Sequence, residues 1–246
     1  IVQGPQETLD AIGGKTKGIM TVASGLAQSD LRITESSVGH MASEFHLVFR
    51  DQDLGCFRLK VPGEHNVLNA TAAVAVGMEL GMPVDAIREA IVNFSGVDRR
   101  FQVKGTERGV TVIDDYGHHP TEVRATLAAA RACRFKNVHV LFQPHRYTRT
   151  EALMDEFARS FHQADTVHVT DIYAASETPI AGVTSQALVD RLHAFGHRGA
   201  SYAGSMEQGI ESVVAAAAPG DAIVTLGAGS VSQSAEGILS QLRKSA

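Results

Sequence analysis

From Phe101 onward the sequence alternates between short runs of β-branched and apolar residues and longer segments with apolar positions at helical spacing. Strands connected through helices lie parallel and need helices on both faces of their sheet. The alternation therefore predicts a Rossmann-like α/β domain with a mostly parallel sheet. Only a tight turn joins the first two strands, which makes one of them antiparallel. We expect strands at 101–106, 110–113, 138–142, 166–169, 201–203 and 222–226, and helices at 122–132, 151–163, 185–194, 206–217 and 230–242.

The residues before this region have a different pattern, which predicts an α+β unit. Period-two segments at 37–50 and 55–61, with a turn at 50–53, indicate a sheet with one wet face. Helical spacing follows at 65–80 and 84–94, and Ser95–Asp98 is typical of a linker. We therefore expect two domains, 1–95 and 96–246.

Composition argues against several classes of protein: nucleic-acid-binding, membrane-spanning and disulfide-rich. The chain has 246 residues, of which 44% are hydrophobic, so it can bury a sizeable core. A net charge of −5 argues against general binding to nucleic acid, and no apolar run is long enough for a membrane span. Cys56 and Cys133 are too few for a disulfide framework, which favours a reducing, cytoplasmic location.

Polar side chains crowd the end of the second predicted strand of the α/β domain. The stretch VIDDYGHHPTE, Val112 to Glu122, places two carboxylates, a phenol and two imidazoles between a strand and a helix start at Pro120. Ligands bind at this position in open α/β sheets. Capping by the aspartates and packing by the histidines remain the plain alternatives.

Two further clusters follow later strands. Gln143–Thr150 contains Arg146 and Arg149, three residues apart beside a helix start, an arrangement suited to a carboxylate or phosphate. We expect this cluster and the previous one to follow adjacent strands. The third, Gly227–Ser230, lacks the remaining features of a dinucleotide fingerprint, so a nicotinamide site is disfavoured. The histidines and Glu122 show no familiar metal-ligand spacing, so no metal site is predicted in this chain.

An asparagine pair opens the helix predicted at 65–80. Asn66 and Asn69 are three residues apart and project from one helix face. Their amides are suited to the edge of a base, although the spacing alone favours the plain alternative of capping and turn chemistry. Earlier in the chain, Gly14-Lys15-Thr16 invites comparison with a phosphate loop, but Leu9 stands where that loop needs a glycine.

Five stretches together resemble the Mur ligases: GEHNVLNATAAVAV, DRRF, VIDDYGHHPTEV, LFQPHRYTRT and DIYAASE. The resemblance runs from about Pro62 to the end of the chain. It implies the end of a central ATPase domain followed by a Rossmann-like ligase domain. The family's UDP-binding domain and Walker loop have no counterpart here. Because the chain also starts at Ile1 without methionine, we expect a fragment that is inactive alone.

Within the family, the stretches are most similar to the branch that adds L-alanine. The resemblance implies ATP-dependent ligation of L-alanine to UDP-N-acetylmuramate through an acyl phosphate, in bacterial peptidoglycan precursor synthesis. Magnesium is expected as a cofactor, held mostly by residues upstream. Two alternatives remain open: a recycling ligase that attaches a preformed tripeptide, and a non-catalytic nucleotide-binding module.

The resemblance also implies roles for individual residues. Contacts to the nucleotide are implied for His65, Asn66, Asn69, Arg100 and Asp115, with the asparagines on adenine and Arg100 on the phosphates. Asp115 either holds the ribose or helps to fix a hinge, which we expect near Ser95–Asp98. Contacts to the incoming amino acid are implied for Tyr116, His118, His145, Arg146 and Arg149. Of these, His118, Arg146 and Arg149 are expected to act in catalysis.

Overall fold

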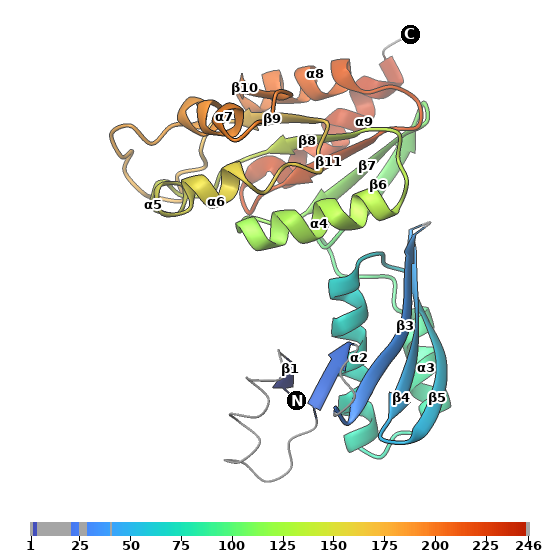
Figure 1. The fold of residues 1–246 in the computed structure, drawn as a ribbon. Coiled ribbons are helices and arrows are strands. Elements are labelled where there is room, and N and C mark those ends of the chain that lie inside the picture. Colours follow the sequence, from blue (N-terminus) through green and yellow to red (C-terminus); the bar gives the residue numbers. More distant parts are fainter. Residues whose placement is uncertain (1, 4–20, 25–28, 40, 245–246) are drawn as a thin grey trace. The chain divides into compact units, whose positions relative to one another are not determined.

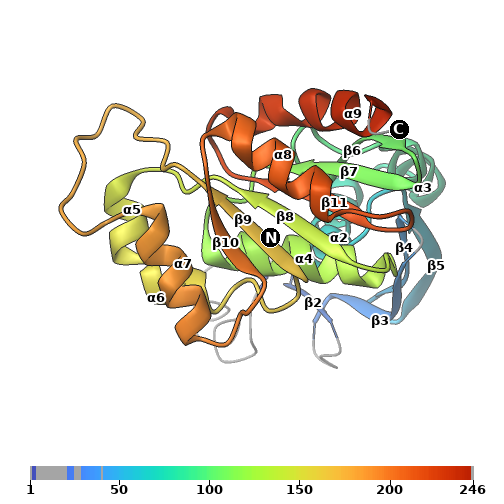
Figure 2. The same cartoon turned by 90° about the horizontal axis from the view of Figure 1, so that it is seen from above.

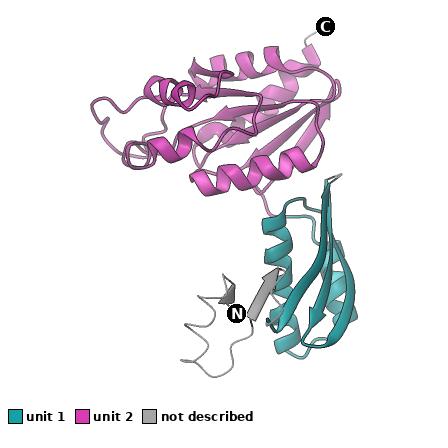
Figure 3. Ribbon diagram, viewed as in Figure 1, with its two compact units in different colours: residues 1–96 teal, residues 97–246 magenta. Residues whose placement is uncertain are grey.

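The structure is a computed structural model that describes residues 2–3, 21–24, 29–39 and 41–244. Its contacts divide the chain into two compact units, residues 1–96 and 97–246 (Figure 3). Gly14-Lys15-Thr16 lies outside the described residues. In the described part of the chain, no helix is both long and apolar enough to cross a membrane.

In the described residues, the first unit has a five-stranded sheet and two helices. The strands β1 to β5 lie in sequence order, and the three long ones form an antiparallel meander (Figure 1). Phe45 and Phe57 stack with their ring centroids 5.7 Å apart in the core. The elements are β1 Val2–Gln3, β2 Thr21–Ser24, β3 Leu31–Gly39, β4 Ala42–Phe49, β5 Gln52–Leu59, α2 Glu64–Glu79 and α3 Val84–Asn93.

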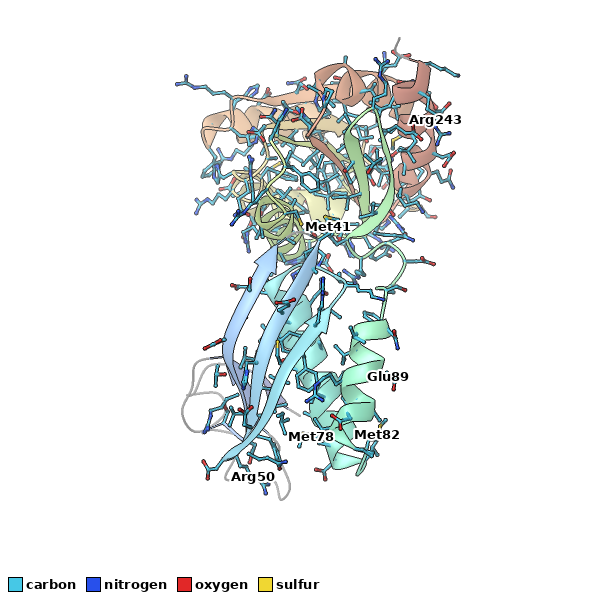
Figure 4. All side chains as sticks on the ribbon, turned by 90° about the vertical axis from the view of Figure 1, so that its right-hand side faces the viewer. Met41, Arg50, Met78, Met82, Glu89 and Arg243 are labelled. Atoms are coloured by element: carbon cyan, nitrogen blue, oxygen red, sulfur yellow. The ribbon has the colours of Figure 1, made fainter. Side chains whose placement is uncertain are left out.

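The prediction of one continuous extended segment in this unit was wrong. The period-two pattern of 37–50 predicted a single extended segment, but β3 ends at Gly39 and β4 begins at Ala42. Met41 turns the chain with φ 64°. This left-handed conformation is uncommon for residues other than glycine, so a methionine does not predict it. Figure 4 shows Arg50 at the next turn, and Met78 and Met82 where α2 gives way to α3.

The second unit contains a six-stranded sheet in the order β10-β9-β8-β11-β7-β6. All neighbouring pairs are parallel except β6 with β7, which form the expected antiparallel pair. The predicted mixed α/β fold class is therefore confirmed. The strands are β6 Gln102–Glu107, β7 Val110–Asp115, β8 Val138–Phe142, β9 Thr166–Thr170, β10 Ala200–Gly204 and β11 Ala222–Leu226.

Helices cover both faces of this sheet (Figures 1 and 2). On one side α8 and α9 pack on a core that includes Val112 and Leu141. On the other side lie α4 and α6, and Phe142 contacts Phe157 with ring centroids 5.5 Å apart. The elements are α4 Pro120–Ala132, α5 Tyr147–Ala152, α6 Met154–Ala158, α7 Ser185–Ala194, α8 Met206–Ala216, η1 Ser230–Gln233 and α9 Ser234–Lys244.

Two predicted helices differ from those observed. The helix expected at 151–163 is broken at Leu153 and ends at Ala158, although Phe157 and Phe161 have helical spacing. Phe161 lies outside the helix and contacts Phe142 at a distance of 5.0 Å between ring centroids. Phe161 is therefore buried by packing on the sheet and not as part of a continuous helix. The last helix begins as the 3₁₀ turn η1.

Candidate functional site

The sheet order brings the three polar clusters to one edge. β11 lies between β7 and β8, with Leu226 in register with both Asp115 and Phe142. The expectation that the first two clusters follow adjacent strands was therefore wrong, because the strand that precedes Gly227 separates them. The Gly227–Ser230 segment consequently lies between the two clusters, at the carboxyl ends of parallel strands where ligands bind.

The two aspartates at the end of β7 are buried and fully engaged. Asp114 accepts hydrogen bonds from Thr225 Oγ1 (2.6 Å) and Arg99 Nε (3.3 Å). Asp115, 4% exposed, accepts from the backbone amides of Phe101 (2.8 Å) and Gly117 (2.7 Å). Burial raises the pKa of Asp115, although these amides and the Arg100 charge oppose the effect. Asp115 thus holds the start of β6 to the end of β7.

An arginine pair flanks the Tyr116 ring. The Arg99 guanidinium lies 4.7 Å from the ring centroid and also donates to Gly227 O at 2.6 Å. Arg100 lies 5.7 Å from the same centroid and 3.5 Å from Glu122 Oε1. Arg99 is thus tied to two strand ends, whereas the half-exposed Arg100 reaches only the surface of the cluster.

Glu122 organises the turn between β7 and α4. Its Oε2 accepts from the backbone amides of His118 (3.0 Å) and His119 (3.1 Å), which forms a capping box with the His119 side chain. The same oxygen lies 3.5 Å from His118 Nδ1. Burial opposes ionisation, but the amide bonds and the neighbouring His118 and Arg100 keep the pKa of Glu122 below its ordinary value.

The cluster after β8 forms a compact cationic group. Arg149 donates to His145 Nδ1 at 3.2 Å, and the His145 ring stacks on Tyr173 at 5.4 Å between centroids. Arg146, with φ 73°, is the N-cap residue of α5 and lies 3.6 Å from Glu177. Burial and the charges of Arg149, His118 and Arg146 lower the pKa of His145. His145 therefore stays neutral between two permanent cations.

The first and second clusters meet through their histidines. The His118 and His145 rings have centroids 6.1 Å apart, and Tyr116 packs edge-on against His118 at 4.9 Å. Two arginines that suit a carboxylate therefore lie beside two imidazoles at one strand-end edge. The residues that the structure brings together here are Tyr116, His118, His145, Arg146 and Arg149.

Between the clusters, Gln143 closes the Gly227–Ser230 segment against β8. Its Oε1 accepts from the Val231 amide at 3.1 Å. Gly227 has φ 143°, and a Cβ on it would lie 2.7 Å from Gln143 O. Close packing therefore requires glycine at position 227. This packing explains the glycine, so no dinucleotide-binding role is needed to explain it.

The asparagine pair belongs to the other unit. Asn66 donates from Nδ2 to Pro62 O at 2.8 Å, so one of its amide hydrogens serves the turn before α2. Asn69 is exposed and His65 is half-buried on the same first turns of the helix. The plain explanation by turn chemistry thus fits Asn66, which does not cap α2, while Asn69 presents its amide to solvent.

Residue patterns alone missed several members of the site. Arg99, Gln143, Tyr173 and Glu177 contact the predicted residues through the fold. All four lie within the stretches DRRF, LFQPHRYTRT and DIYAASE, although the sequence assigned no role to any of them individually. Among the described residues, no group of three or more histidine, cysteine or acidic side chains could hold a metal ion. The donor set here therefore does not fit magnesium, which prefers several oxygen ligands.

Sequence comparisons relate most of the second unit to a known family. Residues 99–229 match the family model described as Mur ligase, glutamate ligase domain. UDP-N-acetylmuramate–L-alanine ligase from Solibacter usitatus (strain Ellin6076) is 62% identical over 217 residues, which cover 88% of this chain and 46% of that protein.

Solved structures show the same architecture. UDP-N-acetylmuramate-alanine ligase from Thermotoga maritima superposes with a TM-score of 0.79 at 26% identity, over 93% of this chain and 49% of that one. A murein peptide ligase from Psychrobacter arcticus 273-4 gives 0.64 at 21% identity, over 97% of this chain and 50% of that one, and shares the fold. The chain spans about half the length of the relatives it matches. Since the family model covers more than half of the chain, the chain belongs to the Mur ligase family.

Proposed function

We propose that this chain is part of an ATP-dependent ligase that joins L-alanine to UDP-N-acetylmuramate in peptidoglycan precursor synthesis. The observation that carries the proposal is the meeting of Arg146, Arg149 and His145 with His118 at one strand-end edge. The 62% identity to a relative named for this reaction supports it. The reaction would proceed through an acyl phosphate made with ATP, in the bacterial cytoplasm.

The incoming amino acid is proposed to lie against the cationic cluster. Arg146 and Arg149 would hold its carboxylate, because guanidinium groups bind carboxylates with paired hydrogen bonds. Tyr116, His118 and His145 would line the space around its amine. Arg146 and Arg149 would also stabilise the charge that develops on the departing phosphate.

Nucleotide contacts are proposed for each unit by itself. His65, Asn66 and Asn69 would contact adenine, with Asn69 supported best because its amide is exposed. Arg100 would contact the phosphates. Of the two roles considered for Asp115, its burial and its bonds to Phe101 and Gly117 favour fixing the Arg100 segment over holding a ribose. Residues 1–95 would form the end of the ATP-binding domain and 96–246 the ligase domain, with the magnesium ligands elsewhere in the complete protein.

The test is ADP release by the complete protein with ATP, magnesium and UDP-N-acetylmuramate. We expect turnover with L-alanine and little with the preformed tripeptide. Turnover with the tripeptide alone would assign the recycling reaction instead. No turnover with either amine would favour a non-catalytic nucleotide-binding module.

A matched pair of variants ties the result to the site. Arg149→Lys removes the guanidinium fork, and losing a charge-assisted hydrogen bond of about 1.5–3 kcal/mol corresponds to a KM for L-alanine raised roughly ten- to hundredfold. Arg159→Lys is the control, since Arg159 packs on Phe195 at 4.6 Å and has no role in the proposed site. Equal effects of the two substitutions would contradict the assignment of Arg149.

A further inference from the structure

The proton positions on the two site histidines follow from their partners. His118 Nδ1 lies 2.9 Å from the carbonyl oxygen of Tyr116. A carbonyl oxygen only accepts hydrogen bonds, so Nδ1 carries the ring proton and donates a hydrogen bond to the carbonyl oxygen of Tyr116. In the neutral ring the lone pair therefore resides on Nε2. His118 is thus held in the tautomer whose outer nitrogen can take up a proton.

His145 is held in the opposite tautomer. Its Nδ1 lies 3.2 Å from Arg149 Nη1, and a guanidinium only donates hydrogen bonds. Nδ1 must therefore accept, which leaves the ring proton on Nε2. Burial and the charges of Arg149, His118 and Arg146 lower the pKa of His145, so a second proton is disfavoured. His145 can donate a hydrogen bond at this edge but is a poor base.

A carboxylate lies beside the protonated nitrogen of His118. Glu122 Oε2 is 3.5 Å from His118 Nδ1, the nitrogen that donates to Tyr116. A negative charge at this nitrogen stabilises the imidazolium that forms when Nε2 is protonated, as the aspartate does in serine proteases. His118 thus combines a free basic nitrogen with a fixed ring and a counter-charge.

We propose that His118 is the base that deprotonates the incoming amino acid and that Glu122 is its positioning residue; this rests on the proposed ligase function. The ammonium N–H bond breaks, its electron pair stays on nitrogen, and the proton moves to His118 Nε2. The amine then bonds to the acyl carbon, the carbon–oxygen bond to phosphate breaks, and phosphate leaves with that electron pair. The second proton on nitrogen departs with the phosphate.

The charge of Glu122 is separable from its capping role. The chain has a second capping box at α8, in which Gln208 Oε1 accepts from the Ser205 amide at 2.9 Å. A neutral glutamine therefore suffices for this backbone contact. Glu122→Gln should keep the start of α4 intact while removing the negative charge beside His118.

The experiment compares two nucleophiles in the complete protein at saturating ATP, magnesium and UDP-N-acetylmuramate. L-Alanine must lose a proton before it attacks, whereas hydroxylamine is already uncharged at neutral pH and traps the acyl phosphate as a hydroxamate. We expect His118→Asn, which can still donate to Tyr116 O, to lower kcat with L-alanine by about 10²–10⁴-fold. Its hydroxamate formation should stay within threefold of the unmodified protein.

Glu122→Gln provides an independent second variant. We expect it to lower kcat with L-alanine about tenfold relative to hydroxamate formation, because it weakens the base without removing it. Taking the ratio of the two nucleophiles cancels any effect through Arg100 on nucleotide binding. His119→Asn is the matched control, since asparagine is a good N-cap residue and His119 only caps α4. Its rates with both nucleophiles should be unchanged.

Two results would overturn the assignment. Equal losses with L-alanine and hydroxylamine in His118→Asn would place His118 in acyl phosphate formation or folding, and an L-alanine kcat within threefold of normal would exclude it as the base. The unmodified protein separates this failure from that of the proposed function. If it forms no hydroxamate and releases no ADP, the ligase function fails, and the base role falls with it.

Discussion

At the residue scale, two buried histidines near the amino ends of β8 and β9 form a hydrogen-bonded chain away from the site. His139 lies 3.1 Å from Asp221 Oδ2 and 2.9 Å from Thr166 Oγ1, which in turn lies 3.0 Å from His168 Nε2. The other His168 nitrogen meets Ser212 Oγ at 2.8 Å. Burial, and then the charge of His139, lower the pKa of His168 to about 4.

This pKa predicts a specific loss of stability in acid. An unfolded histidine titrates near 6.5, so between about pH 6.5 and 4 the unfolded state binds more protons than the folded one. The contribution of His168 is complete above pH 6.5 and is lost as the pH falls through 4, by at most about 3 kcal/mol. Urea unfolding at pH 5 and 7 measures it.

The control is His168→Gln, which keeps hydrogen-bonding groups but cannot be protonated. We expect the difference in unfolding free energy between pH 7 and pH 5 to be smaller in this variant than in the unmodified chain. Carboxylates titrate in both proteins, so the comparison cancels them. An unchanged pH dependence would mean that His168 is not buried in its neutral form.

At the scale of elements, the end of β7 determines where the site residues lie. Asp115 accepts two backbone amides, one from the residue that begins the approach to β6 and one from the turn before α4. Phe101 and Arg99 have left-handed backbones, with φ 48° and 60°, so this segment needs such external anchoring. A single carboxylate thus connects the arginine pair to the histidine turn.

Asp115→Asn is expected to destabilise the second unit. An asparagine amide can accept only one of the two backbone bonds and turns a donor towards the other amide, which costs about 1–3 kcal/mol. The measurement is the free energy of urea unfolding. Asp190→Asn is the control, because Asp190 is exposed and accepts a hydrogen bond from the neighbouring exposed Gln186 side chain. A loss no larger than that of the control would show that Asp115 does not anchor the segment.

At the scale of the whole molecule, residues 97–246 have the properties of an independent folding unit. They contain a complete six-stranded sheet, helices on both faces and their own buried core. Domains of this size fold alone as a rule. We expect a protein of residues 97–246 to unfold in one cooperative urea transition, seen equally by far- and near-ultraviolet circular dichroism. A gradual transition, with near-ultraviolet signal absent from the start, would contradict this.

Local patterns were sufficient for the fold class and for the positions of the polar clusters. Each strand of the second unit and the helices α7 and α8 could be recognised from a short window, because their periodicity is a property of neighbouring residues. The strand-end clusters could be recognised in the same way. The resemblance supplied the family and the roles expected of Tyr116, His118 and Arg149.

Packing in three dimensions was needed for the sheet order and the partners of each site residue. Backbone groups of β11 can pair with any strand, so no local pattern places it between β7 and β8. Arg99 meets Gly227, 128 residues away, and the residue patterns indicate neither the left-handed conformation of Met41 nor the break at Leu153. The tautomers of His118 and His145 likewise follow from the groups beside them, since an imidazole has no fixed donor until a partner sets it.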